Sequence, residues 1–386
     1  MDFTVPESHG AMRQAVVDLC SRFPGEYWRR LEEQSAYPEE FVATMMRQGW
    51  LSMLIPVEFG GAGLGLLEAG IVLEEVNRSG GNASACHAQM YTMGVLLRHG
   101  STAMKERYLP ALAAGALRLQ AFAITEPDAG SDTSRISTRA VGHGDEYVIS
   151  GRKIFISRVE QSDLMLLLAR TDRDHDAASR TEGLSLFLLD LRSAGSGVSW
   201  SRIPIMFNQH TYEVQFDQVV VPRDCLVGEE GAGFRYVIDG WNAERILLAS
   251  EAVGDGRYFI EVAASYATQR EVFGRPIGAN QGVQFPLADA YADVQAASLM
   301  RYNAASLFDQ RLPCGPEANM AKLLTSKASW KAANAALTAM GGYGFAREYD
   351  VERKFRETKL LETAPVSNNL VLAYIGHRVL NMPRSY

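Results

Sequence analysis

The chain changes character at the stretch Ala121-Phe-Ala-Ile-Thr-Glu-Pro-Asp-Ala-Gly-Ser-Asp132. An apolar run of strand-like composition ends at Thr125, and a loop with Pro127 and Gly130 follows it. The loop offers small hydroxyls, carboxylates and backbone N–H groups, which can hydrogen-bond a flat polar ring or a phosphate. An isolated turn of this composition is more often an ordinary surface turn, so its meaning depends on the residues around it.

The sequence on either side of this stretch predicts two helical blocks around a β domain. From about residue 7 to 118 the apolar residues recur at helical spacing. Short β-branched runs bounded by turn residues then follow, such as Glu146-Tyr-Val-Ile-Ser150. The remainder is helical again. We therefore predict an N-terminal helical domain at 1–118, a middle β domain at 119–230 and a C-terminal helical domain at 231–386.

One expected helix face illustrates the C-terminal block. Val283, Leu287, Tyr291 and Val294 recur at spacings of 4, 4 and 3 residues, as on one side of a helix. We expect all four side chains to face the core of that domain.

Composition narrows the class of protein. The chain has 386 residues, of which 47% are hydrophobic and 22% charged, so it can bury a sizeable core. Its net charge of −7 argues against nucleic acid or an anionic membrane as the main partner. The four cysteines and seven histidines show no disulfide or metal-ligand spacing, so we expect no metal. With no membrane-spanning run and no signal-peptide pattern, we expect a cytoplasmic protein.

Four motifs occur in order along the chain. They are Ile124-Thr-Glu-Pro-Asp-Ala-Gly-Ser-Asp132, Gly151-Arg-Lys-Ile-Phe-Ile-Ser157, Tyr266-Ala-Thr-Gln-Arg-Glu-Val-Phe-Gly-Arg-Pro-Ile277, and Gly341-Gly-Tyr-Gly344 followed by Tyr349-Asp-Val-Glu-Arg353. In this order and spacing the chain resembles the acyl-CoA dehydrogenase family of FAD flavoproteins. The resemblance implies an α+β fold that is mostly α, with a middle β-barrel-like domain between an N-terminal helical domain and a C-terminal helical bundle.

The resemblance also implies an FAD site between the β domain and the C-terminal helices. The residues that it would place on FAD are Phe122, Ile124, Thr125, Gly130, Ser131, Phe155, Ile156, Ser157, Arg270, Phe273, Gln281, Gly342, Ser367 and Asn369. Thr125 would hydrogen-bond the pyrimidine side of the flavin, and Ser157 would lie near the ring nitrogen that receives hydride. Arg270 and Phe273 would reach the FAD of a neighbouring subunit, which implies a homo-oligomer, usually a tetramer built as a dimer of dimers.

The reaction of this family needs a carboxylate that removes the proton α to a thioester carbonyl. Much of the family carries this base in a Glu-Gly-Thr motif, but here Pro365 occupies the glutamate position. The isovaleryl-CoA and long-chain branches instead have Glu before Arg on a helix, and Trp241-Asn-Ala-Glu-Arg245 matches that pattern. We predict Glu244 as the base, with Asn242, Arg245 and Ser131 on the substrate. The alternative is a solvated Glu–Arg pair on a helix surface.

Pro365 raises a second question. In the family, the backbone N–H at this position and a ribityl hydroxyl of FAD bind the thioester oxygen, and proline has no N–H. Either the loop shifts so that Val366 donates, or another group replaces the donor, or the flavin hydroxyl remains alone. We hypothesise a compensating donor.

The resemblance therefore implies α,β-dehydrogenation of an acyl-CoA to the trans-2-enoyl-CoA, as in fatty acid β-oxidation, with electron-transfer flavoprotein as the acceptor. The alternatives are an acyl-CoA oxidase, a dehydrogenase of acyl-carrier-protein thioesters, and a catalytically silent flavin-binding relative. The length and branching of the acyl chain cannot be read from the sequence.

Overall fold

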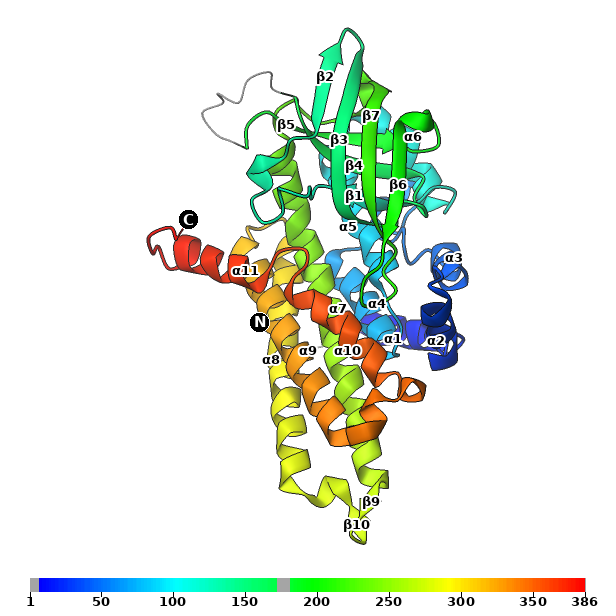
Figure 1. The fold of residues 1–386 in the computed structure, drawn as a ribbon, viewed down its shortest axis with the longest axis vertical. Helices are drawn as coiled ribbons and strands as arrows, with labels where there is room; N and C mark the ends of the chain where they lie inside the picture. Colours follow the sequence, from blue (N-terminus) through cyan, green and yellow to red (C-terminus); the bar gives the residue numbers. More distant parts are fainter. Residues whose placement is uncertain (1–6, 172–180, 386) are drawn as a thin grey trace. The chain divides into compact units, whose positions relative to one another are not determined.

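The computed structural model describes residues 7–171 and 181–385 (Figure 1). The contacts within the chain divide it into two compact units, each built from separate segments. Unit 1 consists of Met1–Pro38, Gly65–Ala83 and Asn242–Tyr386, and unit 2 consists of Glu39–Leu64 and Ser84–Trp241. The N-terminal third of the chain is thus shared between the two units.

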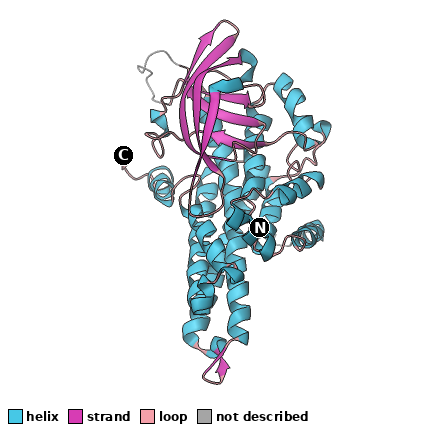
Figure 2. Cartoon of the chain, turned by 45° about the vertical axis from the view of Figure 1, so that its right-hand side comes forward, coloured by secondary structure: helices cyan, strands magenta, loops and turns pink. Residues whose placement is uncertain are grey.

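Unit 2 contains the large sheet, whose strands are magenta in Figure 2. The strands are β1 Leu119–Ala123, β2 Arg139–His143, β3 Glu146–Ser157, β4 Leu164–Arg170, β5 Leu184–Asp190, β6 Val198–Ile203, β7 Thr211–Pro222 and β8 Leu226–Val227. They pair in the order β6-β7-β3-β2-β4-β5-β8, and β1 pairs with β4 in parallel. The β domain predicted between the helical blocks is present.

The run Glu146–Ser150 and the second motif, Gly151–Ser157, form one continuous strand, β3. Gly151 lies in the middle of β3, where the register with β7 shifts. A Cβ atom at this position would lie 2.5 Å from the hydroxyl oxygen of Thr138. Glycine is therefore needed here for the close approach of two segments.

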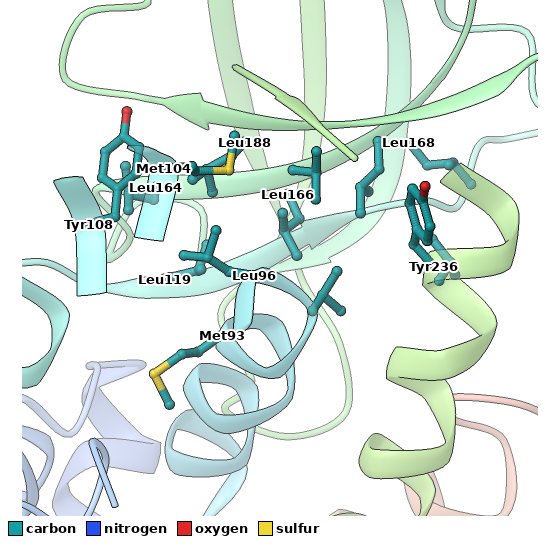
Figure 3. Close-up of a cluster of buried hydrophobic side chains, with 14 of the residues drawn as sticks. Met93, Leu96, Met104, Tyr108, Leu119, Leu164, Leu166, Leu168, Leu188 and Tyr236 are labelled. Atoms are coloured by element: carbon teal, nitrogen blue, oxygen red, sulfur yellow. The ribbon is translucent and has the colours of Figure 1, made fainter. Parts of the chain in front are cut away.

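Two helices of unit 2, α5 Ser84–His99 and α6 Thr102–Ala113, cover part of this sheet. A third helix of this unit, α3 Glu39–Arg47, contacts α5. Figure 3 shows Met93 and Leu96 of α5 beside Leu119, Leu166 and Leu168 of the sheet, all at most 1% exposed. This cluster fixes α5 against β1, which leads into the loop at 124–132.

Unit 1 is helical. Its helices are α1 Glu7–Cys20, α2 Gly25–Gln34, α4 Leu66–Arg78, most of α7 Gly233–Gln269, α8 Gln281–Asp309, α9 Gly315–Met340, α10 Val351–Lys359 and α11 Asn368–Tyr374. A short hairpin of β9 Glu271–Val272 and β10 Arg275–Pro276 connects α7 to α8. Helices α7, α8 and α9 share one apolar core, to which Phe259, Val294 and Ala332 contribute.

The expected apolar face of α8 is wrong at one residue. Leu287 and Val294 are buried, but Tyr291 is 52% exposed. The residues that face the core are Leu287, Ala290, Val294 and Ala297, at spacings of 3, 4 and 3. Tyr291 is therefore one position out of register with the buried stripe.

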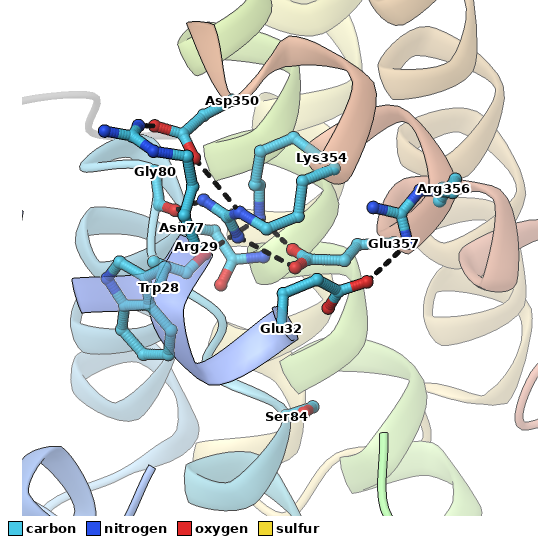
Figure 4. A network of polar contacts seen from close by, with 12 residues as sticks. Trp28, Arg29, Glu32, Asn77, Gly80, Ser84, Asp350, Lys354, Arg356 and Glu357 are labelled. Atoms are coloured by element: carbon cyan, nitrogen blue, oxygen red, sulfur yellow. Dashed lines mark hydrogen bonds and ion pairs between the residues drawn. The ribbon is translucent and has the colours of Figure 1, made fainter. Parts of the chain in front are cut away.

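Buried charges connect the separate segments of unit 1, and part of this network is drawn in Figure 4. The Lys354 ammonium lies 2.7 Å from Asp255 and 3.0 Å from Glu357. Asn77 donates to the same Asp255 carboxylate at 3.0 Å. Arg356 reaches Glu32 of α2 at 2.5 Å. Helices α2, α4, α7 and α10 are thereby held together.

A second buried cluster has one carboxylate among three guanidinium groups. Glu74 of α4 is fully buried and forms ion pairs with Arg13, Arg257 and Arg301. These arginines come from α1, α7 and α8. Such a buried carboxylate requires compensating charge, so the cluster determines where α4 packs.

Among the helices of the described residues, none combines the length and apolarity needed to cross a membrane.

Candidate functional site

The first two motifs lie side by side in unit 2. The backbone N–H of Ile154 donates to the carbonyl oxygen of Thr125 at 2.9 Å. The Lys153 ammonium donates to the carbonyl oxygen of Ile124, also at 2.9 Å. The predicted site residues of β3 and of the loop after β1 therefore belong to one continuous surface of the β domain.

A buried ion pair holds this arrangement together. Lys153 and Glu126 are 0% and 4% exposed at their side chains, and their charged atoms lie 2.9 Å apart. Glu126 also accepts hydrogen bonds from Ser137 and from the backbone of Thr138. Burial alone would raise the pKa of Glu126, but the Lys153 charge and these hydrogen bonds lower it to about 2.

At the end of β3, successive side chains point either toward solvent or into the core of the sheet. Phe155 is 59% exposed and has φ of 59°, in the left-handed region, next to a shift in strand register. Such bulges redirect side chains and are frequent at functional sites. Ile156 is 2% exposed and packs into the core of the sheet, whereas Ser157 is partly buried. A side-chain contact with a ligand is thus open to Phe155 and Ser157, while Ile156 packs inward.

The loop after β1 is accessible. Gly130 and Ser131 are exposed, and Phe122, Ile124 and Thr125 are partly buried. Because the loop is fixed from below by the Glu126–Lys153 pair, its hydroxyls and backbone N–H groups are positioned in advance of any ligand. This suits recognition of a flat polar ring, so the residues present fit the flavin ring system.

Unit 1 contains a pocket of about 520 Å³ at the end of the α7–α9 bundle. Its lining includes Arg270, Thr338, Gly341, Gly342 and Tyr343, and the Arg270 guanidinium lies 5.8 Å from the centre of the Tyr343 ring. The predicted residues Arg270 and Gly342 are therefore brought together. A guanidinium over a glycine-lined hollow of this size fits the diphosphate of a dinucleotide. Thr338 also lines the pocket, and it is not among the residues that we assigned to the cofactor from the sequence.

The hairpin beside this pocket presents a large apolar side chain. Phe273 is fully exposed, with φ of 52° at the turn between β9 and β10. Gln281 is exposed at the first residue of α8. A fully exposed phenylalanine on a projecting turn is typical of a side chain that contacts another molecule.

The predicted base lies on α7 in unit 1. Glu244 and Arg245 are 8% and 7% exposed, so the alternative of a solvated surface pair is wrong. Arg245 donates to Asn242 at 3.2 Å. Burial lowers the pKa of Arg245 to about 10, against the opposing effect of the Glu244 carboxylate, and the guanidinium remains charged at neutral pH.

The segment that carries Pro365 is tied to α9. The Lys322 ammonium is fully buried and donates to Asn368 Oδ1 at 2.8 Å and to the carbonyl oxygen of Glu362 at 3.2 Å. Burial, together with the positive charge of Arg245, lowers the pKa of Lys322 to about 8. Both ends of the segment 362–368 are thus fixed by one side chain.

Two predicted cofactor residues lie just beyond this segment. The hydroxyl of Ser367 caps α11 by accepting from the backbone N–H of Leu370 at 3.3 Å. Asn369 is exposed. A contact from Ser367 to a ligand would share a hydroxyl that already has this capping role.

Sequence reasoning missed the two buried lysines. Lys153 sits at an inward position of β3, where Tyr147 and Ile149 precede it on the same face. A lysine on a buried strand face requires a buried carboxylate as its partner. The position of Lys153 on the same face as Tyr147 and Ile149 could therefore have predicted a buried ion pair. For Lys322 the sequence carries no comparable signal, because its partners come from a segment 40 and 46 residues away.

Models of the acyl-CoA dehydrogenase N-terminal, middle and C-terminal domains match residues 6–116, 121–219 and 231–380. Acyl-CoA dehydrogenase FadE12 of Mycobacterium tuberculosis is 34% identical over 387 aligned residues, which cover 100% of this chain and 99% of that protein.

Solved structures give the same result. The glutaryl-CoA complex of glutaryl-coenzyme A dehydrogenase is 31% identical with a TM-score of 0.92, covering 100% of this chain and 98% of that one. The FAD complex of PigA is 26% identical with a TM-score of 0.91, covering 98% of this chain and 99% of that one.

Proposed function

The chain belongs to the acyl-CoA dehydrogenase family, and from this premise we propose that it oxidises an acyl-CoA thioester to the trans-2-enoyl-CoA with Glu244 as the base. Members of this family are FAD-dependent oxidoreductases, so the protein is a flavoprotein with the family's three-domain fold. The fold, the enzyme class and the cofactor expected from the sequence are thereby confirmed.

The observation that supports Glu244 is its burial beside Arg245 in a chain whose residue 365 is proline. A buried carboxylate is kept only where something compensates for its lost hydration. The adjacent Arg245 guanidinium interacts with that carboxylate, since Glu244 raises the pKa of Arg245 against the effect of burial. Without Glu244, the chain would have no carboxylate at either position where the family places its base.

The proposed mechanism assigns one event to each part of the site. FAD, when bound, supplies the acceptor for the hydride that leaves the β carbon. Glu244 accepts the proton from the α carbon, and Arg245 supplies the neighbouring positive charge on α7. Ser157 and Thr125 orient the ring system through their hydroxyls, and Phe155 shields it from water. Arg270 binds the diphosphate with a charge-assisted contact.

The carbonyl oxygen of the thioester gains negative charge as the α-proton leaves, and it needs a donor that Pro365 cannot provide. A neighbouring group compensates in this proposal, with Val366 N–H as the first candidate. A structure with a bound substrate analogue tests the point. If only the ribityl hydroxyl reaches the carbonyl oxygen, no compensating donor exists.

The proposed partners are an acyl-CoA substrate, electron-transfer flavoprotein as the electron acceptor, and further copies of this chain in a tetramer. Exposed apolar side chains in unit 1 support the oligomer, since Phe273, Phe285 and Leu299 are each more than half exposed. Apolar groups of this size on one unit are typical of interfaces.

Anaerobic titration of the FAD-loaded protein with acyl-CoA thioesters tests the proposed activity. Oxidation of the thioester bleaches the flavin absorbance, and a dye acceptor then restores it with turnover. Rapid recovery in oxygen with formation of peroxide would identify an oxidase instead. Absence of bleaching with every thioester, despite bound FAD, would identify a silent relative.

A further inference from the structure

The Lys322 ammonium connects α9 to both ends of the segment that carries Pro365, and the proposed mechanism does not use it. It donates to the carbonyl oxygen of Glu362 at 3.2 Å and to Asn368 Oδ1 at 2.8 Å. The lysine side chain itself is fully buried. Pro365 and Val366 lie between the two contacts. The conformation of these two residues therefore depends on a side chain that is remote from them in the sequence.

Neighbouring side chains reinforce the two contacts. The Ser326 hydroxyl, one turn further along α9, is a second donor to Asn368 Oδ1 at 3.2 Å. The Lys359 ammonium lies 2.6 Å from the Glu362 carboxylate. The side chain of Glu362 is thus engaged with Lys359, and its backbone oxygen is left to Lys322. Each end of the segment has a local partner of its own, and Lys322 is the side chain that contacts both ends.

The charge of Lys322 is bound by uncharged acceptors, a carbonyl oxygen and an amide oxygen. Burial and the positive charge of Arg245 lower the pKa of Lys322 to about 8, while the Glu362 carboxylate acts in the opposite direction. Arg245 directly follows Glu244 on α7. The lysine that holds the Pro365 segment therefore interacts with the turn of helix that carries the proposed base.

The electrostatic neighbours of Lys322 and Arg245 come from several elements of unit 1. They are Glu244 on α7, Glu362 after α10 with its partner Lys359, Tyr374 of α11 and Cys314 just before α9. Burial also lowers the pKa of Arg245, but only to about 10. Of these two cations, Lys322 is therefore the one that loses its proton first as the pH rises above neutrality.

We propose that Lys322 is a positioning residue for proton transfer, whose charged ammonium holds the Pro365 segment so that the Val366 N–H reaches the thioester oxygen. This inference rests on the proposed function, because Val366 enters the site through it. A neutral amine would bind the same two oxygens more weakly, since charged donors form the stronger hydrogen bonds. The thioester oxygen gains its negative charge only as the α-proton leaves. Lys322 should therefore affect the rate of flavin reduction more than the affinity for the thioester.

Stopped-flow reduction of the FAD-loaded protein without oxygen tests this inference. The reductant is butanoyl-CoA or octanoyl-CoA, whichever reduces the wild-type protein faster, and its concentration is varied to give both a limiting rate and a dissociation constant. At pH 7, Lys322→Met should lower the limiting rate about 100-fold, as for the loss of one oxyanion donor, and change the dissociation constant less than about threefold. Lys327→Met, on the exposed side of α9, is the matched control and should leave both values unchanged.

The pH profile of the limiting rate separates the charge of Lys322 from its bulk. The protonated lysine is the active form, so the wild-type rate should fall as the pH rises from 7 to 9.5 through the pKa of about 8. Asn368→Asp gives the ammonium a carboxylate partner, which raises its pKa and should move this fall upward by about one pH unit or more. Lys322→Arg stays charged throughout, so its rate should not fall in this range, whatever its absolute value.

The outcomes distinguish this inference from the proposed function. Reduction of Lys322→Met at the wild-type rate overturns the inference and leaves the function standing. An equal loss of rate and of thioester affinity also overturns it, because it indicates a general packing role. If Lys322→Met does not fold, the profile of Asn368→Asp decides: an upward shift supports the inference, and an unmoved fall overturns it. No bleaching of the wild-type protein by any thioester overturns the function itself.

Discussion

The Nζ atom of Lys153 lies 2.9 Å from Oε1 of Glu126 in the interior of the β domain, where neither side chain contacts solvent appreciably. The two residues come from the two motifs that we propose to form the flavin wall, one from β3 and one from the loop after β1. The same ammonium also binds the carbonyl oxygen of Ile124. One buried charge pair therefore sets the relative position of the two halves of this wall.

Replacing Lys153 by methionine should destabilise the protein by about 3–5 kcal/mol, because it leaves the Glu126 carboxylate buried without its partner. Urea denaturation measures the change, and the flavin content of the purified variant should fall with it. Arg152→Met is the matched control, since Arg152 is an exposed neighbour in the same strand and should change stability by less than about 1 kcal/mol. Equal effects of the two substitutions would contradict the role of the buried pair.

Acid should destabilise the protein through Glu126. Its pKa is about 2 in the folded protein against 4.5 for the unperturbed group, so it binds fewer protons when folded. Glu126 therefore contributes about 3 kcal/mol to the free energy of unfolding above pH 4.5, and this contribution is lost as the pH falls toward 2. Urea midpoints measured from pH 7 to pH 2.5 should decline across this window. The urea midpoint of Glu126→Gln should fall less steeply with pH than that of the wild-type protein. Parallel curves for the two proteins would show that other carboxylates dominate the acid sensitivity.

Glu244→Gln should retain FAD but fail to bleach when acyl-CoA is added without oxygen. The amide keeps the size of the side chain and removes the proton acceptor, so we expect flavin reduction to slow at least about 10³-fold. Glu261→Gln on the exposed side of the same helix is the control and should reduce at the normal rate. Full and rapid reduction of Glu244→Gln would show that another group is the base.

Arg270→Ala should weaken FAD binding about tenfold or more, because a charge-assisted contact to a diphosphate contributes about 1.5–3 kcal/mol. Arg275 belongs to the same hairpin but bonds Asn280 instead, so Arg275→Ala is the matched control. The dissociation constant is measured by titrating apoprotein with FAD and following flavin fluorescence. Similar constants for the two variants would remove Arg270 from the cofactor site.

The elements of this fold could be predicted where local pattern determines structure. In the N-terminal helical block, for example, Phe41 and Met45 are spaced as on one face of a helix, and both side chains are fully buried in α3. Tyr291 shows the limit of such reasoning, because helical spacing tolerates a shift of one residue and only packing selects the buried row. The placement of α4 in unit 1 could not be predicted, since it depends on Glu74 meeting Arg257 and Arg301 far along the chain.

The candidate site could likewise be predicted only in part from the sequence. The resemblance singled out both motifs, and the fold brings Thr125 of the loop after β1 into backbone contact with Ile154 of β3. The resemblance could not reveal that Ile156 faces the core, because the shift in register within β3 interrupts the alternation of inward and outward side chains at that point. The tether from Lys322 to Asn368 was also beyond prediction, since it joins α9 to the start of α11 through side chains alone.

The discontinuity of unit 1 has a consequence for how the protein is made. All of unit 2 has left the ribosome once residue 241 has emerged, whereas α1, α2 and α4 contact α7, α8 and α10. At roughly 5–20 residues per second, these early helices wait about 15–60 s for their partners. Nascent chains stalled at about residue 280 should therefore contain a protease-resistant unit 2, with α1 and α2 still digestible. The first helices to be translated are among the last to acquire their native contacts, and a chaperone has that interval in which to bind them.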